Sequence, residues 1–184
     1  MKDDDKIVSE TKSDPKNMTV AKTNGEQSSR AEQANNAVTN YALGSILIGA
    51  IPVPVVDLVA LSGLQLKMLH SLSKVYGVEF SEQLGKSLIA SLVGGGVSLS
   101  VSSNLAGLVG RFAKAIPVYG TATGMISVSI LGAASTYAIG KVFIQHFESG
   151  GTFLDFDPQR VRDYYARQFE EGKEKLKSLA GRKP

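Results

Sequence analysis

The chain has 184 residues, a formal net charge of +3 at pH 7 and no cysteine. That length fits one domain with tails. Without cysteine the chain has no disulfide framework, no thiolate nucleophile and no cysteine-based metal site. The small net charge gives no argument for nucleic acid as a partner, and none is expected.

Residues 1–32 are polar and almost free of large apolar side chains. Such a segment cannot bury enough surface to offset the entropy lost on ordering, so the sequence predicts a disordered polar tail. The segment opens with charged residues and has no apolar run, which is not the pattern of a secretory signal.

Residues 33–151 form a charge-poor, glycine-dense block. From Tyr41 to Gln145 only nine of 105 side chains are charged, and 14 of the 19 glycines lie there. A soluble domain normally has about a quarter of its residues charged. The block therefore predicts helices packed inside a membrane or inside an oligomer. Its excess of Lys/Arg, at the edges of uncharged runs, fits an anionic lipid surface or simply cations at helix ends.

The first helical hairpin is predicted over residues 34–77. A helix over 34–50 ends where Pro52 and Pro54 forbid its continuation. Pro54 can open the next helix, which runs to about Tyr76 with Gly77 as its C-terminal cap.

Ser81 is a good N-cap for a third helix. Residues 87–110 then run for 24 positions without a charge. A helix of that length, at roughly 1.5 Å per residue, could cross a hydrocarbon layer. Three consecutive glycines at 94–96 predict a break or kink, because each costs a helix about 1 kcal/mol.

The tetrapeptide Ala-Ile-Pro-Val at residues 50–53 recurs at 115–118 and predicts a second hairpin with its corner at Pro117. The return helix, about residues 120–147, carries glycines at multiples of four residues: Gly120, Gly124, Gly132 and Gly140. In an apolar segment small residues at this spacing let two backbones approach closely. The same glycines also fit close packing in a soluble helical core.

Residues 152–184 are predicted to form a soluble C-terminal unit. Asp157 and Pro158 read as the N-cap and first turn of a helix. Apolar residues mark one stripe of that helix: Val161, Tyr165, Phe169, Leu176 and Leu179. Such a helix commonly docks on its own core, and the alternative is binding to a lipid surface or a partner.

Four segments, taken in this order, carry a family resemblance. They are Ile51-Pro-Val-Pro-Val-Val-Asp57, Leu64–Gly77, Ile116-Pro-Val-Tyr-Gly120 and Thr136–Gly151. Over roughly residues 35–170 the chain resembles the YcjF-like proteins, a bacterial family of unknown function. The resemblance implies membrane association and a link to Era-like small GTPases, beside which members are encoded or to which they are fused. It assigns no catalytic residues.

No catalytic motif is found, and no cofactor is expected. Gly85-Lys86-Ser87 lacks the upstream glycine of a phosphate-binding loop and falls inside a predicted helix. His70 and His146 are too isolated to make a metal set. Asp57 is the lone acid between Glu32 and Glu79. It is either an exposed acid in a helix's first turn or, inside a bilayer, an ion ligand or polar contact between helices.

The sequence thus predicts an all-α protein with two proline-cornered apolar hairpins, embedded in or associated with a membrane, plus an amphipathic C-terminal helix. The expected function is non-enzymatic: anchoring, scaffolding, or a sensing or stress-linked role. The expected place is the bacterial inner membrane with cytoplasmic termini, and the expected partners are lipid, a small GTPase and further copies of the chain. The alternative is a soluble homo-oligomeric or pore-forming helical assembly.

Overall fold

The computed structural model describes residues 15–48, 54–95 and 122–180, with side chains for 24–47, 59–93 and 129–179. These residues form five helices and no strand, which confirms the all-α expectation for the described part of the chain. The helices are α1 (Pro15–Ile48), α2 (Pro54–Tyr76), α3 (Glu82–Gly95), α5 (Ala122–Glu148) and α6 (Arg162–Ala180).

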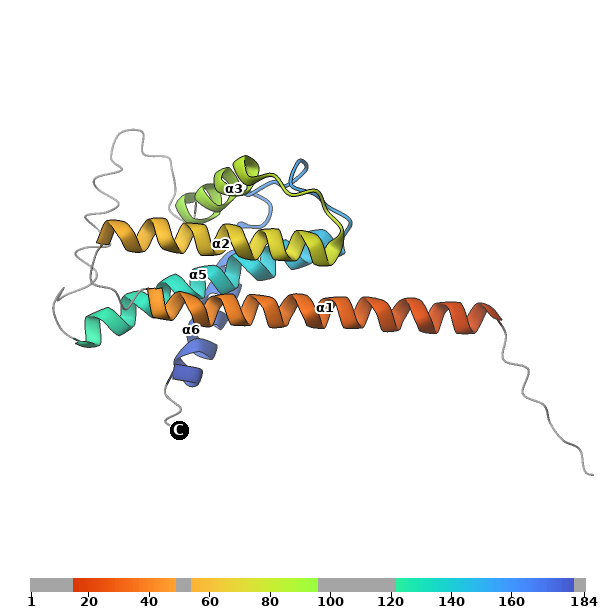
Figure 1. The fold of residues 1–184 in the computed structure, drawn as a ribbon, viewed down its shortest axis with the longest axis horizontal. Helices are drawn as coiled ribbons and strands as arrows, with labels where there is room; N and C mark the ends of the chain where they lie inside the picture. The colour runs from red at the N-terminus through yellow and green to blue at the C-terminus, as the bar shows by residue number, and fades with distance from the viewer. Residues whose placement is uncertain (1–14, 49–53, 96–121, 181–184) are drawn as a thin grey trace, which may run out of the picture.

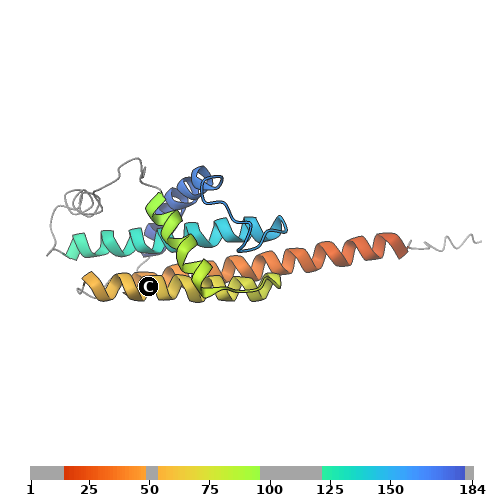
Figure 2. The same ribbon diagram turned by 90° about the horizontal axis from the view of Figure 1, so that it is seen from above.

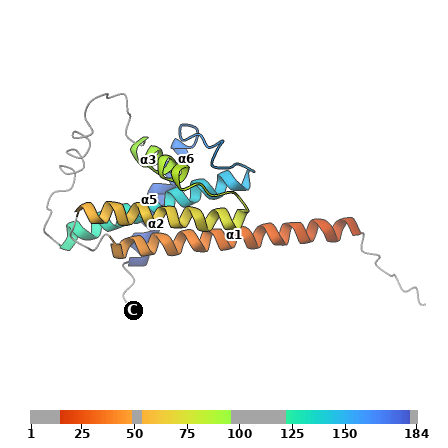
Figure 3. The same ribbon diagram turned by 45° about the horizontal axis from the view of Figure 1, so that its top comes forward.

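Three long helices lie side by side. Helices α2 and α5 run in the same direction and antiparallel to α1 (Figure 1). Helix α6 crosses α5, and α3 crosses α2 and reaches both α5 and α6 (Figure 2). The first half of α1 extends beyond the other helices in every view (Figure 3), and its residues 24–30 are exposed.

Helix α1 begins earlier than the sequence predicted. It starts at Pro15, so residues 15–32 are helical where a disordered tail was expected. Residues 34, 38 and 42 are buried and anchor the packed half of the helix. Once such a turn exists, each added residue gains one hydrogen bond, so a helix anchored here can continue into polar sequence. Residues 1–14 lie outside the described range.

The local signals around α2 and α3 are confirmed. Pro54 is the first residue of α2, and Gly77 follows its last residue with φ of 68°. The Val78 N–H donates to the Ser73 carbonyl at 2.8 Å, which closes a glycine-capped helix end. The Ser81 Oγ accepts the Leu84 N–H at 3.4 Å at the start of α3.

The break predicted at the triple glycine lies at the edge of the described residues and stays a prediction. Helix α3 ends at Gly95, and residues 96–110 lie outside the described range. Across the helices that the structure describes, none is both long enough and apolar enough to span a membrane. Pro52, Pro117 and Gly120 are also outside the described residues, so the two proline corners stay a prediction.

The predicted start of the C-terminal helix at Asp157 is wrong. Helix α6 begins at Arg162, and residues 158–161 form a turn. The Asp157 carboxylate accepts the Gln159 N–H at 2.9 Å, which holds a local turn instead of capping a continuous helix. Tyr165 and Leu176 of the predicted stripe are buried, so α6 docks on the protein's own core.

Small residues bring α1 and α5 together. Residues 133–140 of α5 are all buried. A Cβ on Gly140 would overlap the Val38 side chain of α1, and one on Gly132 would lie 3.3 Å from Leu61 Cδ2 of α2. Gly124 belongs to α5, but its surroundings are outside the described side chains. The two described glycines of the predicted series thus lie at helix contacts within one chain.

Candidate functional site: an apolar end of the bundle

A buried polar junction fixes the register of the three long helices. The Ser45 hydroxyl of α1 donates to Thr136 Oγ1 of α5 at 3.0 Å, and Gln65 Nε2 of α2 donates to the same oxygen at 3.2 Å. The Thr136 hydroxyl in turn donates to the Gly132 carbonyl at 3.1 Å. Because every member has a partner, the junction holds three helices at one level without a buried unpaired group.

Charge is distributed unevenly on the two sides of this junction. We call residues 43–48 of α1, 54–64 of α2 and 122–135 of α5 the apolar end. These segments come together where α2 and α5 begin (Figure 1). Asp57 is the one ionisable side chain among their residues. On the other side lie the charged part of α1 and the ends of α2 and α5, with Lys67, Lys74 and Lys141.

The apolar end exposes large aliphatic side chains. Leu47 is 76% exposed and Val59 is 71% exposed, and Leu43, at the level of the junction, is 36% exposed. Isolated exposed leucines are common on protein surfaces. Here they coincide with helix segments that carry almost no charge, and that combination is typical of a surface meeting lipid or another protein.

Asp57 lies in the first turn of α2, as predicted, because the helix begins at Pro54. Its side chain is outside the described side chains, so the choice between a first-turn acid and an intramembrane ligand stays open.

The sequence pointed to Asp57 and the glycines but not to Leu47 or Val59 as surface residues. Burial of an apolar residue depends on what packs beside its helix, and no local signal reports that.

The opposite end of α5 is locked by aromatic rings. Phe143 stacks on Phe156 with centroids 4.5 Å apart, and Phe153 meets the rings of Phe80 and Phe147 at 5.7 and 5.3 Å. The link between α5 and α6 is therefore pinned on the core at two phenylalanines, 153 and 156, which are both buried. Leu154 between them is 86% exposed.

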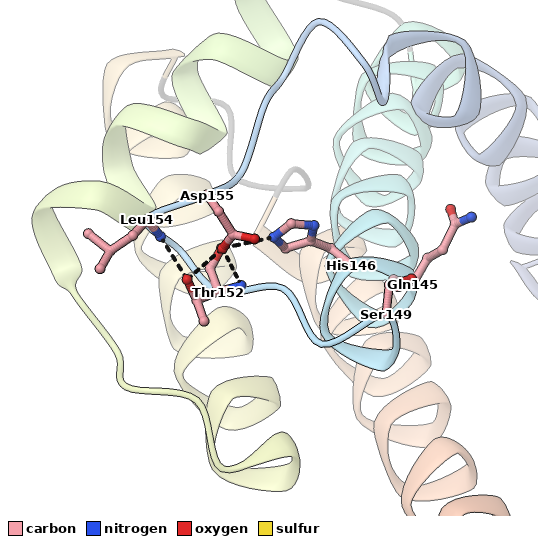
Figure 4. Close-up of polar contacts among 6 residues, drawn as sticks. All are labelled: Gln145, His146, Ser149, Thr152, Leu154 and Asp155. Atoms are coloured by element: carbon pink, nitrogen blue, oxygen red, sulfur yellow. Dashed lines mark hydrogen bonds and ion pairs between the residues drawn. The ribbon is translucent and has the colours of Figure 1, made fainter.

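Hydrogen bonds hold the same link from its polar side (Figure 4). The Asp155 carboxylate accepts the Thr152 N–H at 2.6 Å and the Thr152 hydroxyl at 2.5 Å. These bonds, aided by His146 at 3.8 Å, hold the pKa of Asp155 below its ordinary value. The His146 Nε2 lies 2.8 Å from the Thr152 carbonyl oxygen.

Each of the two histidines lies against an aromatic ring. His70 stacks on Phe80 at 4.7 Å, and His146 lies edge-on to Phe156 at 4.9 Å. The described residues contain no group of three or more His, Asp or Glu side chains that could hold a metal ion. Lys86 of the Gly-Lys-Ser tripeptide pairs with Glu82 at 2.6 Å on the surface of α3.

Helix α6 is bound to α5 by tyrosine hydroxyls. The Tyr137 hydroxyl donates to Glu171 at 2.9 Å, and Ser135 and Tyr165 share a hydrogen bond at 3.1 Å. Burial, and then the bond to Glu171, raises the pKa of Tyr137 above its ordinary value. A Cβ on Gly172 would approach the Tyr137 ring at 2.9 Å, so the two helices are in close contact.

The fold therefore defines a class: an all-helical bundle with an aromatic-locked polar end and an exposed apolar end. Residues 16–174 match the family described as a domain of unknown function, DUF697. The chain belongs to this family.

One named relative is similar to this chain over most of its length. It is a protein of Magnetospirillum gryphiswaldense named Magnetosome membrane protein 22, which is 38% identical over 154 residues. The aligned region covers 82% of this chain and 75% of the relative. No solved structure matches the chain significantly.

Proposed function

We propose that this protein is a non-enzymatic, membrane-associated helical module whose apolar end lies in lipid. The observation that carries the proposal is the exposure of Leu47 and Val59 on helix segments almost free of charge. A relative named as a magnetosome membrane protein, similar over most of the chain, supports it.

The energetics favour such an insertion. Transfer of a leucine or valine side chain from water to an apolar environment stabilises by about 1.5–3 kcal/mol. The apolar end also has contacts that hold helices together in lipid, where the hydrophobic effect between helices vanishes. These are the close approach of Gly132 to Leu61 inside the apolar end and, at its border, the hydrogen bonds of Ser45 and Gln65 to Thr136.

The polar parts of the molecule then remain in water. The exposed residues 24–30 of α1 and the charged face of α6 would lie on the cytoplasmic side of a bacterial inner membrane. In that position the protein would act as an anchor, a scaffold or a sensor, with Asp57, which belongs to the apolar end, as an ion ligand or a polar contact to a neighbouring helix.

Flotation with lipid vesicles tests the proposal. The purified chain is expected to float with vesicles, and the double variant Leu47→Asp, Val59→Asp is expected to bind at least about tenfold more weakly. Both side chains are exposed, so the fold should survive, which far-UV circular dichroism checks. Leu154→Asp is the matched control, because it replaces an exposed leucine far from the apolar end. Equal flotation of all three proteins would contradict the proposal.

The resemblance to YcjF-like proteins extends the proposal to a small GTPase as partner. The exposed residues 24–30 of α1 and the link between α5 and α6 offer polar surfaces for it. Crosslinking in native membranes followed by purification should recover a GTPase. Recovery of nothing but copies of this chain would reject the GTPase and leave the membrane role untouched.

The alternative function is a soluble homo-oligomeric or pore-forming assembly. The same exposed Leu47 and Val59 favour it, because a second copy can cover them as well as lipid can. Purification without detergent separates the two functions. A monodisperse oligomer in plain buffer supports the alternative, whereas aggregation that detergent relieves supports the membrane module.

A further inference from the structure

Two lysines lie at the level where the apolar end stops. Lys67 follows Gln65 of the polar junction by two residues, on the side away from the apolar end. The Lys175 Nζ of α6 lies 5.0 Å from the centre of the Tyr137 ring. Tyr137 directly follows Thr136 of the junction in the chain, so this contact places the Lys175 ammonium beside the residue next to Thr136.

This lysine pair, Lys67 and Lys175, is exposed on two different helices. Among the described residues neither forms an ion pair, in contrast to Lys86 and Lys177, which pair with carboxylates at 2.6 and 3.0 Å. The nearby Glu171 carboxylate is already held by Tyr137 and Gln168, at 2.9 and 3.0 Å. Two ammonium groups without an acidic partner among the described residues therefore lie close to the junction.

We infer that the lysine pair binds the anionic headgroups of the membrane into which the apolar end inserts. The inference rests on the proposed membrane function and adds the lipid class to it. Leu47 and Val59 lie on the hydrocarbon side of the junction, and the two ammonium groups lie at its water side. Lysines in that position contribute electrostatic attraction to an anionic leaflet and stop deeper insertion.

Binding to two kinds of vesicle tests the inference. Vesicles of phosphatidylcholine alone are compared with vesicles that also contain phosphatidylglycerol. The chain should bind the anionic vesicles more tightly, and Lys67→Gln, Lys175→Gln should lose roughly fivefold in affinity per lysine on them alone. The control Lys86→Gln, Lys177→Gln removes paired lysines and should change binding less than about twofold.

Three outcomes separate the claims. If the two double variants lose equal affinity for anionic vesicles, the role of the lysine pair is rejected and the proposed function stands. The same holds if the chain binds both kinds of vesicle equally and still requires Leu47. Binding to neither kind of vesicle would overturn both. Stronger binding to phosphatidylglycerol that high salt abolishes, with the loss confined to the lysine-pair variant, supports the inference.

Discussion

At the scale of single residues, the packing of the bundle depends on glycines, which have no side chain to separate two helices. Gly140 lets α5 approach Val38 of α1 so closely that even one added methyl group would overlap it. Gly63 of α2 is a contrasting case, because nothing lies within 4 Å of a Cβ built there. Both glycines are inside helices, so their intrinsic cost to the helix is similar and the difference lies in packing.

The matched substitutions Gly140→Ala and Gly63→Ala should move stability in opposite directions. Gly140→Ala is expected to lower the free energy of unfolding by about 1–3 kcal/mol through overpacking. Gly63→Ala should raise it by up to about 1 kcal/mol, because alanine is the better helix former. Urea unfolding followed by circular dichroism measures both. A stabilising Gly140→Ala would mean that α1 and α5 are further apart than described.

At the scale of elements, the link between α5 and α6 is a short irregular segment made rigid. Phe153 and Phe156 anchor it in the aromatic cluster, and the Asp155 carboxylate ties it to Thr152. The two kinds of contact respond differently to pH, because the rings of Phe153 and Phe156 carry no titratable group and the Asp155 carboxylate does. The anchoring by the rings should therefore persist when the polar tie is lost.

Acid should loosen this link before it affects the helices. The pKa of Asp155 is lower in the folded state than its ordinary value near 3.8, so its contribution is fully present above about pH 4 and is lost as pH falls below that. Amide-exchange protection at Thr152, relative to Tyr165 in α6, should fall over that range. Asp155→Asn can still accept both bonds without titrating, so its protection should not vary. Identical pH profiles in both proteins would show that another group controls the link.

At the scale of the whole molecule, short-range sequence signals predicted the ends of α2 and the start of α3, and they failed at Asp157, where α6 does not begin. Pro54 and Gly77 act on their own backbone, and the structure places helix ends at both. Signals that depend on neighbours were less informative. The helical state of residues 15–32 depends on the packed half of α1, and the exposure of Leu47 and Val59 depends on which faces the other helices cover.

The sequence predicted some features of the candidate site and not others. The scarcity of charge between Tyr41 and Gln145 indicated a surface that avoids water, and Gly132 and Gly140 indicated close helix contacts. The polar junction of Ser45, Gln65 and Thr136 was not foreseen, because its members are far apart in the chain and ordinary in composition. Only the register of three helices brings them to one point.

Measuring how deeply the apolar end enters lipid tests the proposed membrane role most directly. The chain has no cysteine, so Leu47→Cys and Leu154→Cys each give a single site for an environment-sensitive fluorophore. On anionic vesicles the label at 47 should shift to shorter wavelength and be quenched by lipid-attached spin labels, and the label at 154 should do neither. Equal, water-like emission at both positions would contradict the central claim that this end of the bundle lies in the membrane.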